Sequence, residues 1–228
     1  MRHILLITTI LFLACDGGIG AGTGEFTTAT SDPQGTATSV ATVAGGCFWC
    51  IEAPFEKVPG VVEVVSGYTG GGEHAPSYQQ VSGGATGHTE AVQIHFDSTV
   101  VTYEQILDYF WRQFDPTDAG GSFVDRGSQY RSGIFYHNEH QKRIAEESRQ
   151  TLTQSGRFDD SIVTPIQPLD TFWVAEAYHQ DFYKKSERRY KSYRSGSGRD
   201  AFIDDVWGGD RTPDWLKSLR QKHESDHE

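Results

Sequence analysis

Two cysteines separated by two residues, Cys47 and Cys50, are the part of this sequence best suited to chemistry. They belong to the run Gly-Gly-Cys-Phe-Trp-Cys, which follows a predicted strand (residues 40–44) and begins a predicted helix (47–58). Cys47 would lie in the first helical turn, where free N–H groups and the helix dipole favour negative charge. Such a position lowers the pKa of a thiol, so we predict that Cys47 is a nucleophile near neutral pH.

The residues beside Cys47 could admit a small apolar group. Gly45 and Gly46 would let a substrate approach the backbone closely. Phe48 and Trp49 could form an apolar wall beside the nucleophile. A structural disulfide, or a pair of buried thiols in an exported domain, is the alternative for this spacing.

The sequence argues against a metal centre. A structural zinc site needs four ligands, and the chain has no second pair of neighbouring cysteines. His137 and His140 are spaced like ligands, but two histidines three residues apart more often share one face of a helix. We therefore expect no metal.

Glu90 is the candidate proton donor. Residues 90–96 alternate in polarity as a half-buried strand does, and every second residue from His88 to Phe96 would share one face. A carboxyl on an apolar face has a raised pKa and stays protonated at neutral pH, as a general acid must. The alternative is a solvated carboxylate at the end of the strand.

The third cysteine, Cys15, indicates export. It follows an apolar run (residues 4–13) that begins after Arg2 and is too short to remain as a membrane-spanning helix. The Leu-Ala-Cys sequence at its end resembles a bacterial lipoprotein signal, so we predict acylation of Cys15 and a membrane-anchored lipoprotein of the cell envelope. An ordinary secretory peptide cleaved nearby, or an uncleaved N-terminus with a buried Cys15, is the alternative. Residues 16–39, rich in Gly, Ser and Thr, would form a flexible linker.

The composition indicates one globular domain. The 228 residues include 13 Phe, 10 Tyr and 5 Trp, which is enough bulk for a hydrophobic core. Loss of residues 1–15 would remove one basic and no acidic residue, leaving 19 basic against 31 acidic residues. This acidic balance disfavours nucleic acid as a partner, and we expect a monomer.

Mixed strands and helices predict an α+β two-layer sandwich. Thr102 with Gln105, and Asn138 with Gln141, fit capping boxes that would begin two helices. We place the folded domain at 40–207 and a polar tail at 208–228, of which the last dozen residues are expected to fray. Further strands are expected at 61–68, 90–96, 130–136, 162–166 and 171–174, and a further helix at 175–185.

Six blocks of sequence between residues 41 and 206 resemble, in their order and spacing, those of the peptide methionine sulfoxide reductase A family. An ordered set of this kind is far more specific than any single motif. The blocks are GGCFWCIEAPFEKVPGVVEVVSGYTGG, PSYQQV, GATGHTEAVQIHFD, FDPTD, DRGSQYRSGIFY and AEAYHQDFY.

With the expected elements, the resemblance implies a mixed sheet, a ferredoxin-like core and a long irregular C-terminal segment. It implies reduction of the S-epimer of methionine sulfoxide, in oxidised proteins and as the free amino acid. No cofactor would be bound, and a thioredoxin-type reductant would supply the electrons. Glu90 matches the family's catalytic acid, and His179, in the last block, is expected to make a structural hydrogen bond.

Five further residues match the family's substrate pocket. Tyr78 and Tyr130 match the phenols that hold the sulfoxide oxygen, a task suited to hydroxyls because they donate without a charge. Asp125 matches a polar residue of the same pocket. Phe48 and Trp49 match the wall around the S-methyl group of the substrate.

The chain departs from many family members in its second redox cysteine. The implied cycle leaves Cys47 as a sulfenic acid, which a second thiol resolves to a disulfide. Many members use a C-terminal cysteine, whereas this chain has none after Cys50. Cys50 is the intrachain candidate, although Cβ atoms at i and i+3 of a regular helix lie about 5–6 Å apart, against about 3.8 Å in a disulfide. Pro54 loosens the helix there, and reduction by an external thiol is the alternative.

Two other functions use the same motif. A general thiol-disulfide oxidoreductase of the cell envelope would use the Cys-x-x-Cys pair catalytically, and a non-enzymatic envelope module would use it as a structural disulfide. Trp49 lies between the cysteines rather than before the first, which disfavours the oxidoreductase. The ordered blocks favour the sulfoxide reductase.

Overall fold

The computed structural model describes residues 38–225. The predicted signal peptide, Cys15 and nearly all of the predicted linker lie outside the described residues. Within residues 38–225, no helix combines the length and the apolar character needed to cross a membrane.

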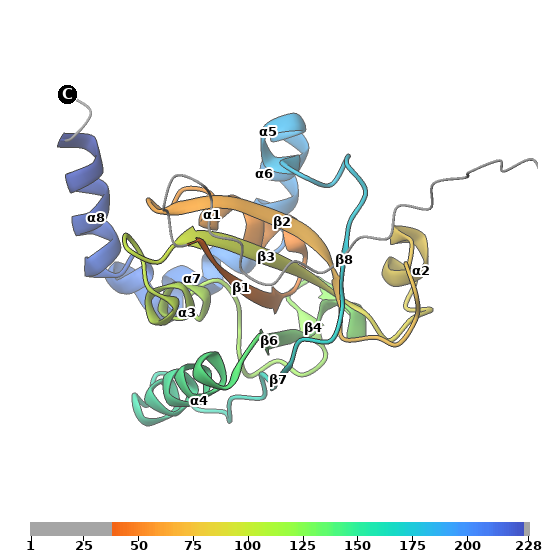
Figure 1. Cartoon of the computed structure of the whole chain (residues 1–228), viewed down its shortest axis with the longest axis horizontal. Helices are drawn as coiled ribbons and strands as arrows, with labels where there is room; N and C mark the ends of the chain where they lie inside the picture. Colours follow the sequence, from red (N-terminus) through yellow and green to blue (C-terminus); the bar gives the residue numbers. More distant parts are fainter. Residues whose placement is uncertain (1–37, 226–228) are drawn as a thin grey trace, which may run out of the picture. The chain divides into compact units, whose positions relative to one another are not determined.

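A six-stranded sheet forms one layer of the fold (Figure 1). From one edge to the other, its strands are β7 (Ile166–Pro168), β6 (Ser132–Tyr136), β1 (Thr38–Gly45), β3 (Thr89–Asp97), β2 (Val61–Thr69) and β8 (Phe172–Val174). Strand β7 runs parallel to β6, and the other neighbouring pairs are antiparallel. Helix α1 (Phe48–Phe55) connects β1 to β2, and α3 (Tyr103–Phe110) lies between β3 and β6. The mixed sheet and the ferredoxin-like core are confirmed.

Helices α1 and α3 cover the same face of the sheet. The rings of Phe55 and Tyr109 meet edge to face with centroids 5.3 Å apart. Alternate side chains of β3, including Val92 and Phe96, are fully buried in this layer. Glu90 has the same parity and points into the same layer, as predicted.

Both predicted N-cap residues begin helices, but only the first forms a complete capping box: at Asn138 the Gln141 side chain accepts from the N–H of His137 instead. At the start of α3, the N–H of Gln105 donates to the Thr102 hydroxyl at 3.3 Å, and the N–H of Thr102 donates to the Gln105 side chain at 2.9 Å. Asn138 accepts the N–H of Gln141 at 2.9 Å and begins α4 (Glu139–Gln154). Local sequence therefore sets where these helices begin.

The chain after β8 differs from the prediction of a helix over 175–185. Only α5 (Phe182–Lys185) is helical, because Asp181 adopts a left-handed conformation (φ 54°) and ends any continuous helix. The amide of Gln180 instead binds both backbone groups of Ser66, accepting from its N–H at 2.8 Å and donating to its carbonyl at 2.9 Å. The predicted strand at 162–166 likewise retains only Ile166, the first residue of β7.

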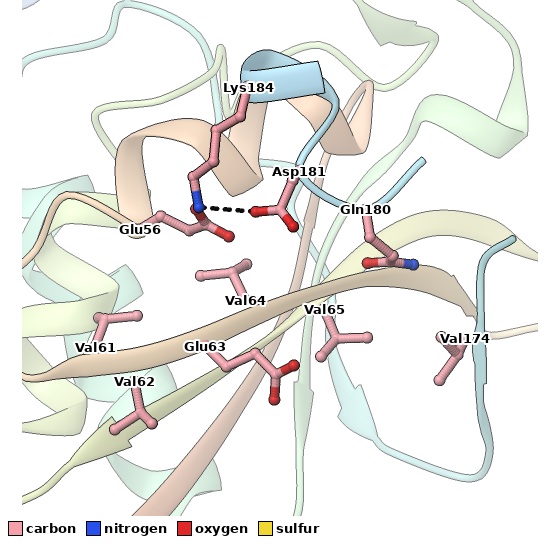
Figure 2. A pocket seen from close by; sticks show the side chains of 10 residues that line it. All are labelled: Glu56, Val61, Val62, Glu63, Val64, Val65, Val174, Gln180, Asp181 and Lys184. Atoms are coloured by element: carbon pink, nitrogen blue, oxygen red, sulfur yellow. Dashed lines mark hydrogen bonds and ion pairs between the residues drawn. The ribbon is translucent and has the colours of Figure 1, made fainter. Parts of the chain in front are cut away.

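Gln180 also lines a hollow of about 430 Å³ along the outer edge of β2 (Figure 2). Strand β8 pairs only with Gly67–Thr69, so Val61–Val65 have no neighbouring strand on that side among the described residues. Lys184 crosses the hollow and its ammonium binds Asp181 at 2.8 Å. The Ser66 carbonyl also accepts the N–H of Ala175 at 2.9 Å, and the Gln180 amide donates to the Ala175 carbonyl at 2.9 Å. The Gln180 amide thus bridges β2 and the residue that follows β8, and it fixes the segment between β8 and α5.

The described part of the C-terminal segment, through Ser225, is helical, so the prediction of a long irregular segment there is wrong. Two glycines lie at helix boundaries: Gly198 (φ 82°) precedes α7 (Arg199–Trp207) and Gly208 (φ 48°) follows it. The elements are α6 (Glu187–Gly196), α7 (Arg199–Trp207), the 3₁₀ turn η2 (Gly208–Arg211) and α8 (Asp214–Ser225).

A few large side chains hold these polar helices on the domain. Trp207 is buried, and the guanidinium groups of Arg112 and Arg157 lie 4.4 and 4.2 Å from its ring centroid. Leu216 of α8 is fully buried in the main core. Because most residues of these helices are polar and the buried ones are far apart, the sequence shows no clear amphipathic pattern that would predict the helices.

Leu216→Ala should lower the free energy of unfolding by about 2–4 kcal/mol, because it removes a fully buried side chain and leaves a cavity. Leu219→Ala, on the same helix but only half-buried, should cost less than about 1.5 kcal/mol. Urea unfolding of the two variants measures the difference. Equal, small losses would mean that α8 does not pack on the domain.

Candidate active site

Cys47 lies at the junction of β1 and α1. It is the N-cap residue of α1, with ψ 121°, and it is 4% exposed. Gly46 adopts φ 89°, and a Cβ there would lie 2.4 Å from the Cβ of Ser122 and 2.8 Å from the guanidinium of Arg199. Glycine is therefore required for the chain to turn from strand to helix, and the predicted place of Cys47 at the helix start is confirmed.

Cys47 and Cys50 are free, buried thiols joined by a side-chain hydrogen bond. The N–H of Cys50 also donates to the Cys47 carbonyl at 3.0 Å. Cys47 precedes the helix with an extended ψ, so the pair does not lie within a regular helix, and the hydrogen bond between the side chains brings the two sulfurs together.

Burial sets the protonation of the pair, and it acts against the prediction made from the helix start. It raises the pKa of Cys47, and the hydrogen bond to Cys50 raises that pKa further. The pKa of Cys50 falls to about 7, first because its sulfur accepts this hydrogen bond and then, against burial, because of the charges of Arg199 and Arg194. The pair therefore loses its first proton near neutral pH, and the two hydrogen-bonded sulfurs share the remaining one. Burial opposes the predicted lowering of the pKa at Cys47.

Glu90 faces the start of α1. Its carboxyl accepts the N–H of Phe48 at 3.0 Å, which satisfies one of the unpaired donors at the helix N-terminus. Glu90 is 2% exposed, and this burial raises its pKa to about 8 despite the hydrogen bond. The carboxyl is therefore protonated at neutral pH. It is bound to the amide of the residue that directly follows Cys47, where a general acid for that cysteine would lie.

Tyr78 and Tyr130 both lie close enough to Glu90 for its charge to act on them. Tyr78 is the first residue of α2 (Tyr78–Ser82), and its N–H donates to Glu176 at 2.9 Å. Tyr130 ends the 3₁₀ turn η1 (Ser128–Tyr130). Burial, and then the charge of Glu90, raise the pKa of Tyr78 to about 12 and raise that of Tyr130 as well. Both phenols stay protonated and can donate hydrogen bonds.

A short hairpin brings Asp125 to the same site. Asp125 belongs to β5 (Asp125–Arg126), which pairs with β4 (Gly121–Ser122). Its carboxylate accepts the hydroxyl of Tyr193 from α6, and burial raises its pKa. The charge of Asp125 acts on Cys47 and Tyr130, so the three groups lie near one another.

The two aromatic residues that follow Cys47 belong to a cluster of rings. Trp49 stacks on Phe182 with centroids 3.8 Å apart and planes 9° apart. The ring of Phe48 lies 5.0 Å from that of His179, and the ring of Tyr78 lies 4.3 Å from it. Phe48 and Trp49 therefore form part of a closed apolar wall.

His179 does not make the structural hydrogen bond that we predicted. Both ring nitrogens are buried and have no hydrogen-bond partner among the described residues. Burial lowers the pKa of His179 to about 4, so the ring is neutral at physiological pH. It contributes to the wall as an aromatic ring.

The sequence did not single out several residues that complete the site. Tyr193 and Arg194 lie in a polar stretch that carries no motif. Arg199 is 1% exposed, yet it donates to the carbonyl of Gly45 at 3.1 Å and to the hydroxyl of Ser122 at 3.2 Å. A buried arginine has no signature in sequence, because its carbonyl partners come from distant segments. Among residues 38–225, no group of three or more His, Cys, Asp or Glu side chains could hold a metal ion.

Comparison with known proteins identifies the family. A family model described as peptide methionine sulfoxide reductase matches residues 39–211. Peptide methionine sulfoxide reductase MsrA of Bacillus subtilis (strain 168) is 56% identical over 169 residues, which cover 74% of this chain and 96% of that protein. The chain belongs to the peptide methionine sulfoxide reductase family. The MsrA of Listeria monocytogenes serotype 4a (strain HCC23) is 57% identical over a stretch of the same length.

Solved structures agree with this assignment. The crystal structure of Mxr1 from Saccharomyces cerevisiae in reduced form superposes with a TM-score of 0.64 at 31% identity, covering 71% of this chain and 91% of that chain. Methionine sulfoxide reductase A of Corynebacterium diphtheriae gives a TM-score of 0.59 at 31% identity, covering 66% and 76%. The predicted α+β fold and enzyme class are confirmed: the chain is an oxidoreductase of the peptide methionine sulfoxide reductase family.

Glu90→Gln should lower activity near neutral pH by about 10²–10⁴-fold, because it removes the proton donor while keeping an acceptor for Phe48. The folded-state pKa of about 8 lies above the ordinary value of 4.5, so ionisation of Glu90 destabilises the fold as pH rises from 4.5 through 8. The Tm of Glu90→Gln should therefore exceed that of the wild type at pH 8 and approach it near pH 4. Turnover assays and thermal unfolding across this range check both effects, and near-normal turnover at pH 7 would remove Glu90 from the acid role.

Proposed function

We propose that this enzyme reduces the S-epimer of methionine sulfoxide, in oxidised proteins and as the free amino acid, at Cys47. The observation that carries the proposal is the 3.0 Å hydrogen bond between the Phe48 amide and the Glu90 carboxyl. It holds an acid that is protonated at neutral pH beside the attacking thiol. A sulfoxide needs both groups, because its sulfur must be attacked while its oxygen is protonated.

In the first step the Cys47 sulfur attacks the sulfoxide sulfur and Glu90 protonates the oxygen. The hydroxyls of Tyr78 and Tyr130 donate to that oxygen as negative charge develops on it. The oxygen ends on Cys47 as a sulfenic acid and methionine leaves. The methionine sulfur gains the two electrons that the cysteine sulfur loses.

The thiol pair supplies the nucleophile. One proton leaves the pair near pH 7, and the hydrogen bond between the sulfurs lets the remaining proton move from Cys47 to Cys50. Cys47 can then attack as a thiolate even though burial raises its own pKa. The aromatic wall of Phe48 and Trp49 would receive the S-methyl group.

Cys50 then resolves the sulfenic acid. It is buried, lies against Cys47, and is the other cysteine of the described residues. The resulting disulfide is reopened by a thioredoxin-type dithiol, which returns both thiols without a bound cofactor. Direct attack of an external thiol on the sulfenic acid is the alternative route.

The acid distinguishes this function from general thiol-disulfide exchange. Exchange between thiols and disulfides needs a thiolate but no proton donor for an oxygen atom. Burial raises the pKa of the Glu90 carboxyl to about 8, and the Phe48 amide holds this carboxyl beside Cys47. Burying a carboxyl destabilises the fold, and thiol-disulfide exchange would make no use of it.

Separated epimers of N-acetylmethionine sulfoxide test the function. With dithiothreitol as reductant, the wild type should consume the S-epimer and leave the R-epimer. Cys47→Ser should lose at least about 10³-fold in rate, because it removes the nucleophile. Cys50→Ser should still release one methionine per protein in a single turnover. Consumption of the R-epimer, or an active Cys47→Ser, would contradict the proposal.

A second proposal concerns location: Cys15 carries a lipid that anchors the enzyme to the cell envelope. The support is the short apolar run before Leu-Ala-Cys and the Gly/Ser/Thr-rich residues 16–37, which would tether the domain. In a bacterial host fed a palmitate analogue, the wild type should be labelled and sediment with membranes. Cys15→Ala should be unlabelled, while Cys50→Ala should keep the label. Equal labelling of both variants would refute lipidation at Cys15.

A further inference from the structure

The carbonyl of Cys50 lacks its usual helical partner. In α1 it would accept a hydrogen bond from the residue four positions on, which is Pro54, and proline has no N–H. Cys50 is fully buried. An unpaired carbonyl in this place would cost about as much as a lost hydrogen bond.

Arg194 supplies the missing donor from outside the helix. Its Nη1 donates to the Cys50 carbonyl at 3.0 Å, while its Nε and Nη2 bind the carboxylate of Asp200 at 3.1 and 2.9 Å. Asp200 also accepts from Arg211 at 2.6 Å. The Arg194 side chain is only 13% exposed. The C-terminal helices therefore present one fixed guanidinium to the peptide of Cys50.

The same guanidinium lies within electrostatic reach of the Cys50 thiol. The positive charges of Arg194 and Arg199 favour the thiolate, and the charge of Asp125 opposes it. Several titratable groups, from five different parts of the chain, interact electrostatically with this sulfur. They are Cys47 before α1, Glu90 of β3, Asp125 of β5, Tyr190, Tyr193 and Arg194 of α6, and Arg199 of α7.

We propose that Arg194 is the positioning residue for Cys50 in the resolving step, because it replaces the helical hydrogen bond that Pro54 removes and holds the Cys50 peptide through a side chain. The inference rests on the proposed role of Cys50 as the resolving thiol. It gives the C-terminal segment a part in catalysis even though that segment carries no cysteine.

The chemistry of the step explains why a side-chain donor suits this place. The Cys50 sulfur attacks the Cys47 sulfur, the S–S bond forms, the S–O bond breaks, and the oxygen leaves with a proton as water. The cysteine sulfur that attacks is oxidised as the sulfenic sulfur is reduced. A disulfide holds its two Cβ atoms about 3.8 Å apart, and its closure acts directly on the Cys50 peptide. A guanidinium can follow a shift of that peptide, whereas a backbone amide of the same helix would resist it.

Single-turnover kinetics of Arg194→Gln test the inference. Reduced protein is mixed with one equivalent of N-acetylmethionine sulfoxide, quenched at intervals, and analysed for methionine, for Cys47 sulfenic acid trapped by dimedone, and for the Cys47–Cys50 disulfide. At a pH above the midpoint of both proteins, where the thiol pair is ionised in each, methionine should form within about twofold of the wild-type rate at that pH, because Arg194 does not touch the sulfoxide. Disulfide formation should slow about tenfold, and trapped sulfenic acid should accumulate. The pH at which the rate of disulfide formation is half its maximum should rise by about one unit.

Two further variants separate position from fold. Arg188→Gln makes the same change at an exposed position of α6 and should leave both steps unchanged. Arg194→Lys keeps the charge but cannot bind Asp200 and the Cys50 carbonyl in the same fork. Arg194→Lys should therefore restore the wild-type pH midpoint of disulfide formation, while the rate of disulfide formation stays below that of the wild type.

Disulfide formation at the wild-type rate and midpoint in both Arg194 variants would overturn the inference and leave the proposed function intact. A wild type that reduces the sulfoxide but forms no Cys47–Cys50 disulfide would instead remove Cys50 as the resolver. Loss of methionine formation in Arg194→Gln, with a normal Tm, would also overturn the inference, since it would place Arg194 in the first step.

Discussion

The hydrogen bond from the Phe48 amide to the Glu90 carboxyl joins the start of α1 to the beginning of β3, and the site depends on it. It gives a helix-end donor a partner, and it fixes a buried acid next to the nucleophile. Burial is what keeps Glu90 protonated at neutral pH, so the acid would lose its function if water entered. The aromatic rings around Cys47 are therefore part of the proton chemistry as well as a surface for the substrate.

The same burial opposes the formation of a thiolate, which the first step also needs. Positive charge from the C-terminal helices offsets this effect. A side-chain hydrogen bond from Cys47 lowers the pKa of Cys50, and the charges of Arg199 and Arg194 lower it further. Arg199 is tolerated in the core because its guanidinium binds the Gly45 carbonyl and the Ser122 hydroxyl. A neutral acid and an ionisable thiol pair are thus buried beside each other. The first depends on low polarity around the carboxyl, and the second depends on nearby positive charge.

Elements whose signal is local were predicted well. The N-cap residues Thr102 and Asn138 begin helices because the bonds involved lie within four residues. Alternation along β3 placed Glu90 on the covered face because side chains alternate along any strand. The helix expected at 175–185 failed because Gln180 binds the backbone of Ser66, a residue far away in sequence. The C-terminal helices were missed because few of their residues are buried, and those few pack on distant partners.

The sequence by itself determined the family, the α+β fold implied by it, and the residues that we propose to react: a thiol at a helix start, an acid on a covered strand face and two phenols. These follow from short-range patterns and from ordered motifs. Only the tertiary structure decided how the protons are distributed. A pKa depends on every charge and on all the water around a group, and those surroundings come from segments such as α6 and α7 that lie far from Cys47 in the chain. The neutral ring of His179, the hydroxyl of Tyr193 and the guanidinium of Arg194 became part of the site through folding alone.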